Sequence, residues 1–242
     1  MTQKAKIELH DINKTFRNDI FTHPEKALEQ VNCSFKAGRA TALLGHNGAG
    51  KTTSMRLILG LLKQDSGTIL IDGTPMRRED RRRIGYMPET SKLPPDLCAE
   101  ELLRFQLNLF KAPSSRQEER TTVGTTWEQI GLSSQHRLKK IRHLSKGMGR
   151  RLSWGLAIIH NPDLLILDEP FTGLDPLGRQ DLSKWISDWV TKGGSVIMST
   201  HELDLARRLC DDFVVLRTGR VAYSGDSKIS DDRLLSFFAG AP

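Results

Sequence analysis

The alternation of apolar and polar residues predicts a strand-rich beginning of the chain. Residues 7–10 and 28–35 alternate in the way typical of strands that bury one face, and residues 67–73 form a strand pattern closed by a turn. We therefore expect an N-terminal antiparallel β-subdomain made of about residues 1–40 and 67–75.

The middle of the chain has helical spacing. From about residue 99 to 159, apolar residues recur three and four positions apart, with a second such segment around residues 127–132. This pattern predicts a helical subdomain over about residues 90–160, inserted into the surrounding strand-rich sequence.

Short apolar runs then alternate with amphipathic segments. The strand patterns lie at residues 164–167, 195–199, 213–216 and 221–223, and the helical patterns lie at 177–191 and 202–210. This rhythm is typical of βαβ units and predicts a mostly parallel sheet with helices on its faces. A short amphipathic helix is expected at about residues 231–239. The chain is thus predicted to be one α/β domain, residues 1–242.

A glycine-rich segment follows the apolar residues 41–44 and precedes an amphipathic run at 55–62. It fits G-x-x-x-x-G-K-[ST], whose backbone N–H groups and helix N-terminus bind phosphate. Lys51 is expected to reach the β- and γ-phosphates, and the Thr52 hydroxyl to bind Mg²⁺. The predicted nucleotide-binding residues here are Gly45, His46, Asn47, Gly48, Ala49, Gly50, Lys51, Thr52 and Thr53. An ordinary glycine-rich turn is disfavoured because Lys-Thr completes the pattern.

Two adjacent carboxylates follow the strand predicted at residues 164–167. Open α/β sheets bind ligands at the carboxyl ends of their strands, which makes Asp168 a candidate for holding Mg²⁺. Glu169 would polarise the attacking water, a task that needs a carboxylate near the nucleophile. His201 follows the next parallel strand and is a third catalytic candidate, whereas acids that merely face solvent are the simpler alternative.

Composition limits the remaining possibilities. The chain has 242 residues, is 38% hydrophobic and carries a formal net charge of +7. No run approaches the ~20 apolar residues of a membrane-spanning helix, and the N-terminus lacks a signal-peptide core, so we expect a cytosolic chain. The three cysteines are widely spaced and are expected to be buried thiols.

Much of the excess positive charge falls in two clusters, at residues 77–83 and 137–142. We interpret both clusters mainly as solvated surface, with a nearby membrane surface as the functional alternative. Aromatic residues are not interleaved with these charges, which argues against single-stranded nucleic acid as a partner.

A further segment, Leu144, Ser145, Lys146, Gly147 and Met148, resembles the LSGGQ signature of ABC transporter ATP-binding subunits. The resemblance covers essentially the whole chain and is supported by motif order and spacing. Besides the phosphate-binding loop and the signature, it includes a Q-loop position at Glu89, the Asp168–Glu169 pair, a D-loop at residues 173–175 and a switch histidine at His201.

The resemblance implies a P-loop NTPase core and an ATPase that uses ATP and Mg²⁺. Two copies would pair head to tail around two ATP molecules, each held by the phosphate-binding loop of one copy and by Ser145 and Gly147 of the other. Asp175 would join the nucleotide-binding residues, and Glu89 would act as a catalytic residue and a metal ligand. Separate transmembrane permease subunits would hold the chain peripherally at the cytoplasmic face of the inner or plasma membrane, and no nucleic acid would be bound.

Three positions depart from the usual pattern. Lys146 replaces a glycine, Met148 replaces a glutamine, and Glu89 stands where the family usually has glutamine. A carboxylate at position 89 can still bind Mg²⁺ but lacks the amide donor, and Lys146 either adds charge near the nucleotide or is a tolerated surface lysine. These variants resemble the ABC-2-type exporter branch, in which a permease would dock near residues 92–97.

Two questions stay open at this point. Phe16 occupies the usual place of the aromatic residue that stacks on adenine, but residues 17–25 look longer than normal, so Phe21 or His23 are alternatives, and a plain core role for the aromatic is another. The alternative function is a soluble ABC ATPase acting on ribosomes or nucleic acid, which the single phosphate-binding loop and the modest helical insertion disfavour.

Overall fold

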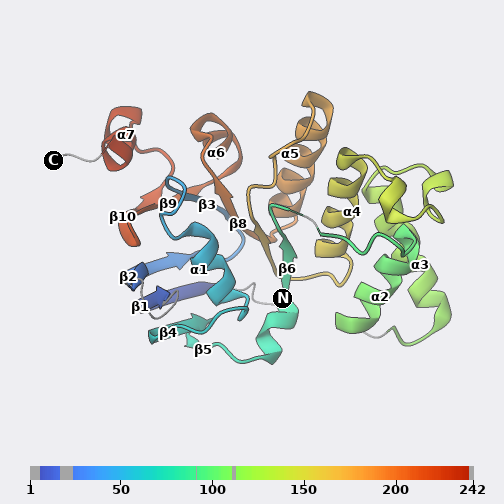
Figure 1. The fold of residues 1–242 in the computed structure, drawn as a ribbon, viewed down its shortest axis with the longest axis horizontal. Coiled ribbons are helices and arrows are strands. Elements are labelled where there is room, and N and C mark those ends of the chain that lie inside the picture. Colours follow the sequence, from blue (N-terminus) through green and yellow to red (C-terminus); the bar gives the residue numbers. More distant parts are fainter. Residues whose placement is uncertain (1–5, 17–23, 91, 111–112, 240–242) are drawn as a thin grey trace.

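The structure, a computed structural model, describes residues 6–16, 24–90, 92–110 and 113–239. Its N-terminal part is a four-stranded antiparallel sheet in the order β2-β1-β4-β5 (Figure 1). The strands are β1 (Ile7–Phe16), β2 (Glu25–Phe35), β4 (Ser66–Ile71) and β5 (Thr74–Pro75). Ile7 lies opposite both Phe35 and Ile71, and all three side chains are buried. The alternating pattern therefore places its apolar positions on one face.

The second sheet has six strands in the order β10-β9-β3-β8-β7-β6. They are β3 (Ala40–Leu44), β6 (Ile84–Met87), β7 (Leu164–Leu167), β8 (Ser195–Thr200), β9 (Asp212–Arg217) and β10 (Arg220–Asp226). The pairs from β9 through β6 are parallel, whereas β10 is antiparallel to β9. Every residue of β3, β7 and β8 is buried, as expected for parallel strands covered on both faces.

Helices cover the parallel sheet (Figure 1). Helix α1 (Lys51–Ile58) shares a core with the antiparallel sheet and with β7 and β8 residues such as Ile166 and Ile197. The opposite face of the six-stranded sheet packs against α5 (Pro176–Thr191), α6 (Leu203–Leu209) and α7 (Asp231–Ala239). The same core extends to a group of helices beside β6, namely α2 (Ala99–Phe110), α3 (Arg116–Gln129) and α4 (Lys146–Ile158), together with the 3-10 turns η2 (Ser134–His136) and η3 (Ile141–His143).

This architecture confirms the predicted α/β fold class, with an antiparallel sheet, a mostly parallel sheet and a group of helices. None of the helices in the described ranges is long and apolar enough to cross a membrane. The boundaries differ in detail from the sequence prediction. The helix expected to begin near Lys51 does begin there, but it spans only Lys51–Ile58, whereas the amphipathic run continues to residue 62. It ends before Gly60, whose φ of +69° is a left-handed conformation that stops helices.

The prediction of three buried thiols was correct only for Cys210. Cys33 and Cys98 are of intermediate exposure. Cys33 lies on β2, the edge strand of the antiparallel sheet, where it packs against the core and keeps some access to solvent.

Candidate nucleotide and magnesium site

The phosphate-binding loop connects the carboxyl end of β3 to the first turn of α1. Two of its glycines are required sterically: a Cβ on Gly45 would lie 2.4 Å from the Leu216 carbonyl oxygen, and one on Gly50 would lie 2.8 Å from the Ala27 carbonyl oxygen. Both also have positive φ. Between them His46, Asn47 and Gly48 are exposed. The loop is therefore anchored at both ends and open in the middle, in front of the helix N-terminus.

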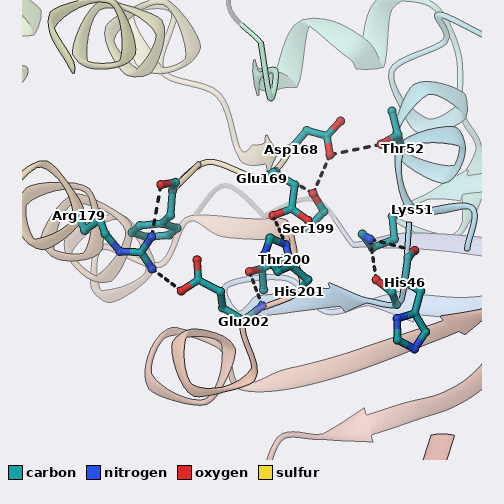
Figure 2. A network of polar contacts seen from close by, with 12 residues as sticks. His46, Lys51, Thr52, Asp168, Glu169, Arg179, Ser199, Thr200, His201 and Glu202 are labelled. Carbon is teal, nitrogen blue, oxygen red and sulfur yellow. Dashed lines mark hydrogen bonds and ion pairs between the residues drawn. The ribbon is translucent and has the colours of Figure 1, made fainter. Parts of the chain in front are cut away.

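Lys51 begins α1 and lies under the loop (Figure 2). Its Nζ donates hydrogen bonds to the carbonyl oxygens of Gly45 at 2.6 Å and His46 at 3.3 Å. Burial lowers the pKa of Lys51, while the nearby carboxylates of Glu169, Asp168 and Glu89 oppose that shift. The ammonium group thus has a buried stem and faces the acidic side of the site, which suits it to a polyphosphate with bound Mg²⁺.

Asp168 lies at the end of β7 and is only 3% exposed. Its Oδ1 accepts a hydrogen bond from Ser199 Oγ at 2.6 Å, and Thr52 Oγ1 lies 3.5 Å away on α1. Figure 2 shows these side chains converging from β7, β8 and α1. The adjacent strands β7 and β8 bring the two strand ends together, and the Thr52 hydroxyl and the Asp168 carboxylate supply the oxygen ligands that Mg²⁺ prefers.

Ser199 was missed by the sequence analysis. It is fully buried in β8, and its Oγ accepts a hydrogen bond from the Glu169 backbone N–H at 2.8 Å while donating to Asp168. One hydroxyl therefore holds both members of the acidic pair. A polar residue at the carboxyl end of an otherwise apolar strand was the available signal, but the pairing of β8 with β7 gives it meaning.

Glu169 has an unusual backbone conformation for a residue with a side chain. Its φ is +41°, a region that costs free energy outside glycine. The His201 Nδ1 atom lies 3.1 Å from Glu169 Oε2. Because the Glu169 side chain is 14% exposed and that of His201 is 64% exposed, the pair borders the open site. A carboxylate held in this way can accept a proton from a water in front of it.

A cavity of about 460 Å³ joins these groups. Among the predicted residues it is lined by Phe16, His46, Asn47, Gly48, Gly50, Lys51, Thr52, Thr53, Glu89, Asp168, Glu169 and His201, and it adds Glu25, Ala27 and Thr172. Gly45 and Ala49 are buried below the loop surface. Phe21 and His23, the alternatives to Phe16, lie outside the described residues.

The described residues contain no group of three or more His, Cys, Asp or Glu side chains that could hold a metal by themselves. The oxygen donors Thr52, Asp168 and Glu89 nevertheless border the same cavity. This incomplete set fits Mg²⁺, which usually keeps several waters and takes further oxygens from substrate phosphates.

Ser145, Gly147 and Asp175 lie elsewhere. They line a second cavity, of about 220 Å³, between the start of α4 and the start of α5. Ser145 is the N-cap of α4, which begins at Lys146, and its Oγ accepts a hydrogen bond from the Met148 N–H at 3.2 Å. Asp175 caps α5 in the same way through Gly178. These three residues face open surface at two helix N-termini.

The chain matches known proteins over most of its length. A protein-family model described as ABC transporter matches residues 28–172. The chain is 34% identical to a "Nod factor export ATP-binding protein I" from Burkholderia orbicola over 91% of this chain and 71% of that relative.

Solved structures give the same result. A structure described as the ATP-binding subunit of an ABC transporter is 32% identical and aligns with a TM-score of 0.80 over 97% of this chain and 95% of its own. A dimeric, post-hydrolysis ATP-binding cassette bound to ADP and Pi has a TM-score of 0.82 over 93% of this chain and 100% of its own, but its 22% identity supports the fold alone. The chain therefore belongs to the ABC transporter family and is one of its ATP-binding ATPase cassettes.

Proposed function

We propose that this chain hydrolyses ATP as one half of a homodimer. Hydrolysis would drive a transmembrane permease that acts as an exporter. The observation that carries the proposal is the separation of two binding surfaces. The phosphate-binding loop and the pair Ser145 and Gly147 line different cavities that share no residue. The signature surface of one copy is therefore free to meet ATP held by the loop of a second copy.

Hydrolysis is assigned to the residues around the larger cavity. Lys51 and the loop N–H groups bind the phosphates, and Thr52, Asp168 and Glu89 would hold Mg²⁺, which neutralises phosphate charge when bound. Glu169 accepts the proton of the attacking water. His201 orients the Glu169 carboxylate through the 3.1 Å contact. Phe16 borders the same cavity and is proposed to stack on adenine.

Two surfaces are proposed to bind the membrane partner. The segment at residues 92–97 is largely exposed, including Pro94, Pro95 and Asp96. A groove of about 560 Å³ lies between the end of α1, the 3-10 turn η1 (Glu79–Arg83) and the end of α2. It is lined by Leu59, Gly60, Arg78, Glu79, Arg81, Arg82, Leu109 and Phe110.

The groove carries three arginines against one glutamate beside apolar side chains, which favours an acidic amphipathic segment of the permease. Through such a partner the chain would lie peripherally at the cytoplasmic face of the membrane. The export function named for the Burkholderia orbicola relative supports an exporter here.

Glu169→Gln tests the proposal. The substitution removes the proton acceptor and leaves the phosphate contacts, so ATP turnover should fall by about 10²-fold or more while ATP affinity is retained. Size-exclusion chromatography with ATP and Mg²⁺ should show the variant accumulating as a dimer. Unchanged turnover would refute the role of Glu169, a monomer at all ATP concentrations would refute the shared site, and co-purification with ribosomes instead of a membrane protein would favour the soluble alternative.

A further inference from the structure

Arg150 lies inside the molecule, on the second turn of α4, and is 8% exposed. Its guanidinium donates to four backbone carbonyl oxygens. One nitrogen, Nη1, lies 2.7 Å from the Pro88 oxygen and 2.9 Å from the Glu89 oxygen. The other, Nη2, lies 2.6 Å from the Pro170 oxygen and 3.3 Å from the Glu169 oxygen. One side chain thus joins two segments that are distant in sequence.

Those two segments carry the two carboxylates of the candidate site. Residues 88–89 follow β6 and residues 169–170 follow β7, and the two strands are parallel neighbours. Glu89 and Glu169 both border the larger cavity. Across the described ranges, the hydrogen bonds of Arg150 go to backbone carbonyl oxygens and not to either carboxylate. Arg150 therefore holds the backbone from which each carboxylate projects.

The arrangement at Glu169 is two-sided. Ser199 accepts the Glu169 N–H at 2.8 Å, and Arg150 donates to the Glu169 carbonyl. The backbone between these two contacts has a φ of +41°, a conformation that persists only when its surroundings impose it. Arg150 is therefore one of the groups that hold Glu169 in its strained orientation.

Burying an arginine in a helix contact costs free energy, because the guanidinium loses its hydration. Burial lowers the pKa of Arg150, opposed by the charges of Glu89 and Asp168, and its Nε atom has no hydrogen-bond partner within the part of the chain that the structure describes. An apolar side chain of similar size would avoid this desolvation. The planar fork of donors, which can hold two carbonyl pairs at once, is what an apolar residue could not supply.

The same helix begins at the signature surface. Ser145 caps α4, five positions before Arg150, and lines the second cavity together with Gly147. Arg150 itself reaches this second cavity. Any movement of the start of α4 therefore acts, through one rigid turn of helix, on the backbones of residues 88–89 and 169–170.

We propose that Arg150 is a positioning residue that sets the Glu89 and Glu169 backbones and couples them to the signature end of α4. This rests on the proposed function, in which Ser145 and Gly147 contact ATP bound by the second copy. Arg150 then makes the hydrolytic carboxylate of one site responsive to occupancy of the other, because both depend on the placement of the same helix.

The neighbouring Arg151 offers a matched control. It is also partly buried on α4, but it donates to the Ile130 carbonyl at 3.0 Å, pairs with Asp181 and lies over the Trp185 ring at 5.5 Å. None of these contacts involves residues 88–89 or 169–170. Replacing Arg151 should therefore loosen α4 packing without disturbing the two carboxylate-bearing segments.

The test compares Arg150→Met, Arg150→Gln and Arg151→Gln with the unmodified full chain. Steady-state ATP hydrolysis gives kcat, KM and the Hill coefficient, titration with a fluorescent ATP analogue gives affinity, and thermal unfolding gives Tm. For Arg150→Met we expect kcat to fall about tenfold or more with KM and affinity within about threefold, and the Hill coefficient to move toward one. Arg150→Gln, which keeps two amide donors, should recover part of kcat. Arg151→Gln should lower Tm but keep kcat within about twofold.

Three results would overturn the proposal. The first is an unchanged kcat in Arg150→Met. The second is a loss of kcat in Arg151→Gln equal to that in Arg150→Met when the two variants have similar Tm values, and the third is a kcat in Arg150→Gln no higher than in Arg150→Met. Arg150→Gln also keeps the test valid if the methionine variant does not fold. The outcomes separate the two proposals. An inactive unmodified chain contradicts the proposed function, whereas an active chain insensitive to Arg150→Met contradicts only the role of Arg150.

Discussion

Ser199→Ala is the substitution whose effect the structure predicts most directly. The Ser199 hydroxyl is fully buried and makes two hydrogen bonds, one to the Asp168 carboxylate at 2.6 Å and one from the Glu169 N–H at 2.8 Å. Alanine leaves both partners in place and supplies neither contact. The substitution therefore deletes the shared support of the acidic pair while adding no bulk.

The magnitude follows from what is left unpaired. A hydrogen bond to a charged group contributes about 1.5–3 kcal/mol, and a buried N–H without a partner costs about 1–3 kcal/mol. Water entering from the adjacent cavity will offset part of this, so we expect a loss of about 2–4 kcal/mol in the free energy of unfolding. For a chain of this size that corresponds to a decrease of about 4–16 °C in Tm.

The measurement is urea unfolding followed by circular dichroism, with Tm as a second readout. Ser183→Ala is the matched control, because the Ser183 Oγ donates to the Arg179 carbonyl four residues earlier on α5, at 2.8 Å, a contact within one helix. Such a contact contributes little, and the control should stay within about 0.5 kcal/mol of the unmodified chain. A Ser199→Ala variant that is equally stable would refute the claim that this hydroxyl holds the acidic pair.

Two further predictions concern the buried side chains of Lys51 and His160. Lys51→Ala should weaken ATP affinity by about 10- to 100-fold, measured by equilibrium titration, because a charge-assisted phosphate contact is lost; retained affinity would place the phosphates elsewhere. His160 is buried, stacks on Phe110 at 4.4 Å and has a pKa lowered by burial from the ordinary value of 6.5. The unfolded chain therefore binds the proton more tightly than the folded chain. The free energy of unfolding should fall as the pH drops below 6.5 and passes through the lower folded-state pKa of His160. Below that folded-state pKa, His160 should cause no further decrease. His160→Phe should flatten this part of the stability profile, and an unchanged slope would assign it to other groups.

Much of the fold followed from local pattern. The continuous apolar runs at β3, β7 and β8 indicated strands buried on both faces, and the structure has them at the centre of the parallel sheet. The direction of β10 was harder to predict. Its sequence resembles that of any half-exposed strand, and its antiparallel pairing with β9 follows from a short turn that leaves no room for a crossover.

Some residues of the candidate site could likewise be predicted from local pattern, and others could not. The glycine-lysine-threonine loop and the Asp168–Glu169 pair were recognisable because their chemistry depends on spacing within a few residues. The partners of that pair were not, since Ser199 and Arg150 come from other elements and look like ordinary members of a strand and a helix.

The sequence by itself therefore determined the elements, the phosphate-binding loop and the acidic pair, all of which depend on neighbours along the chain. Only the tertiary structure decided that Ser199 binds the Glu169 N–H while Arg150 binds the Glu169 carbonyl, and that Ser145 lies in a different cavity from the loop. The physical reason is that strand order and helix packing bring these groups together, and contacts between distant residues leave no periodic trace in either segment alone.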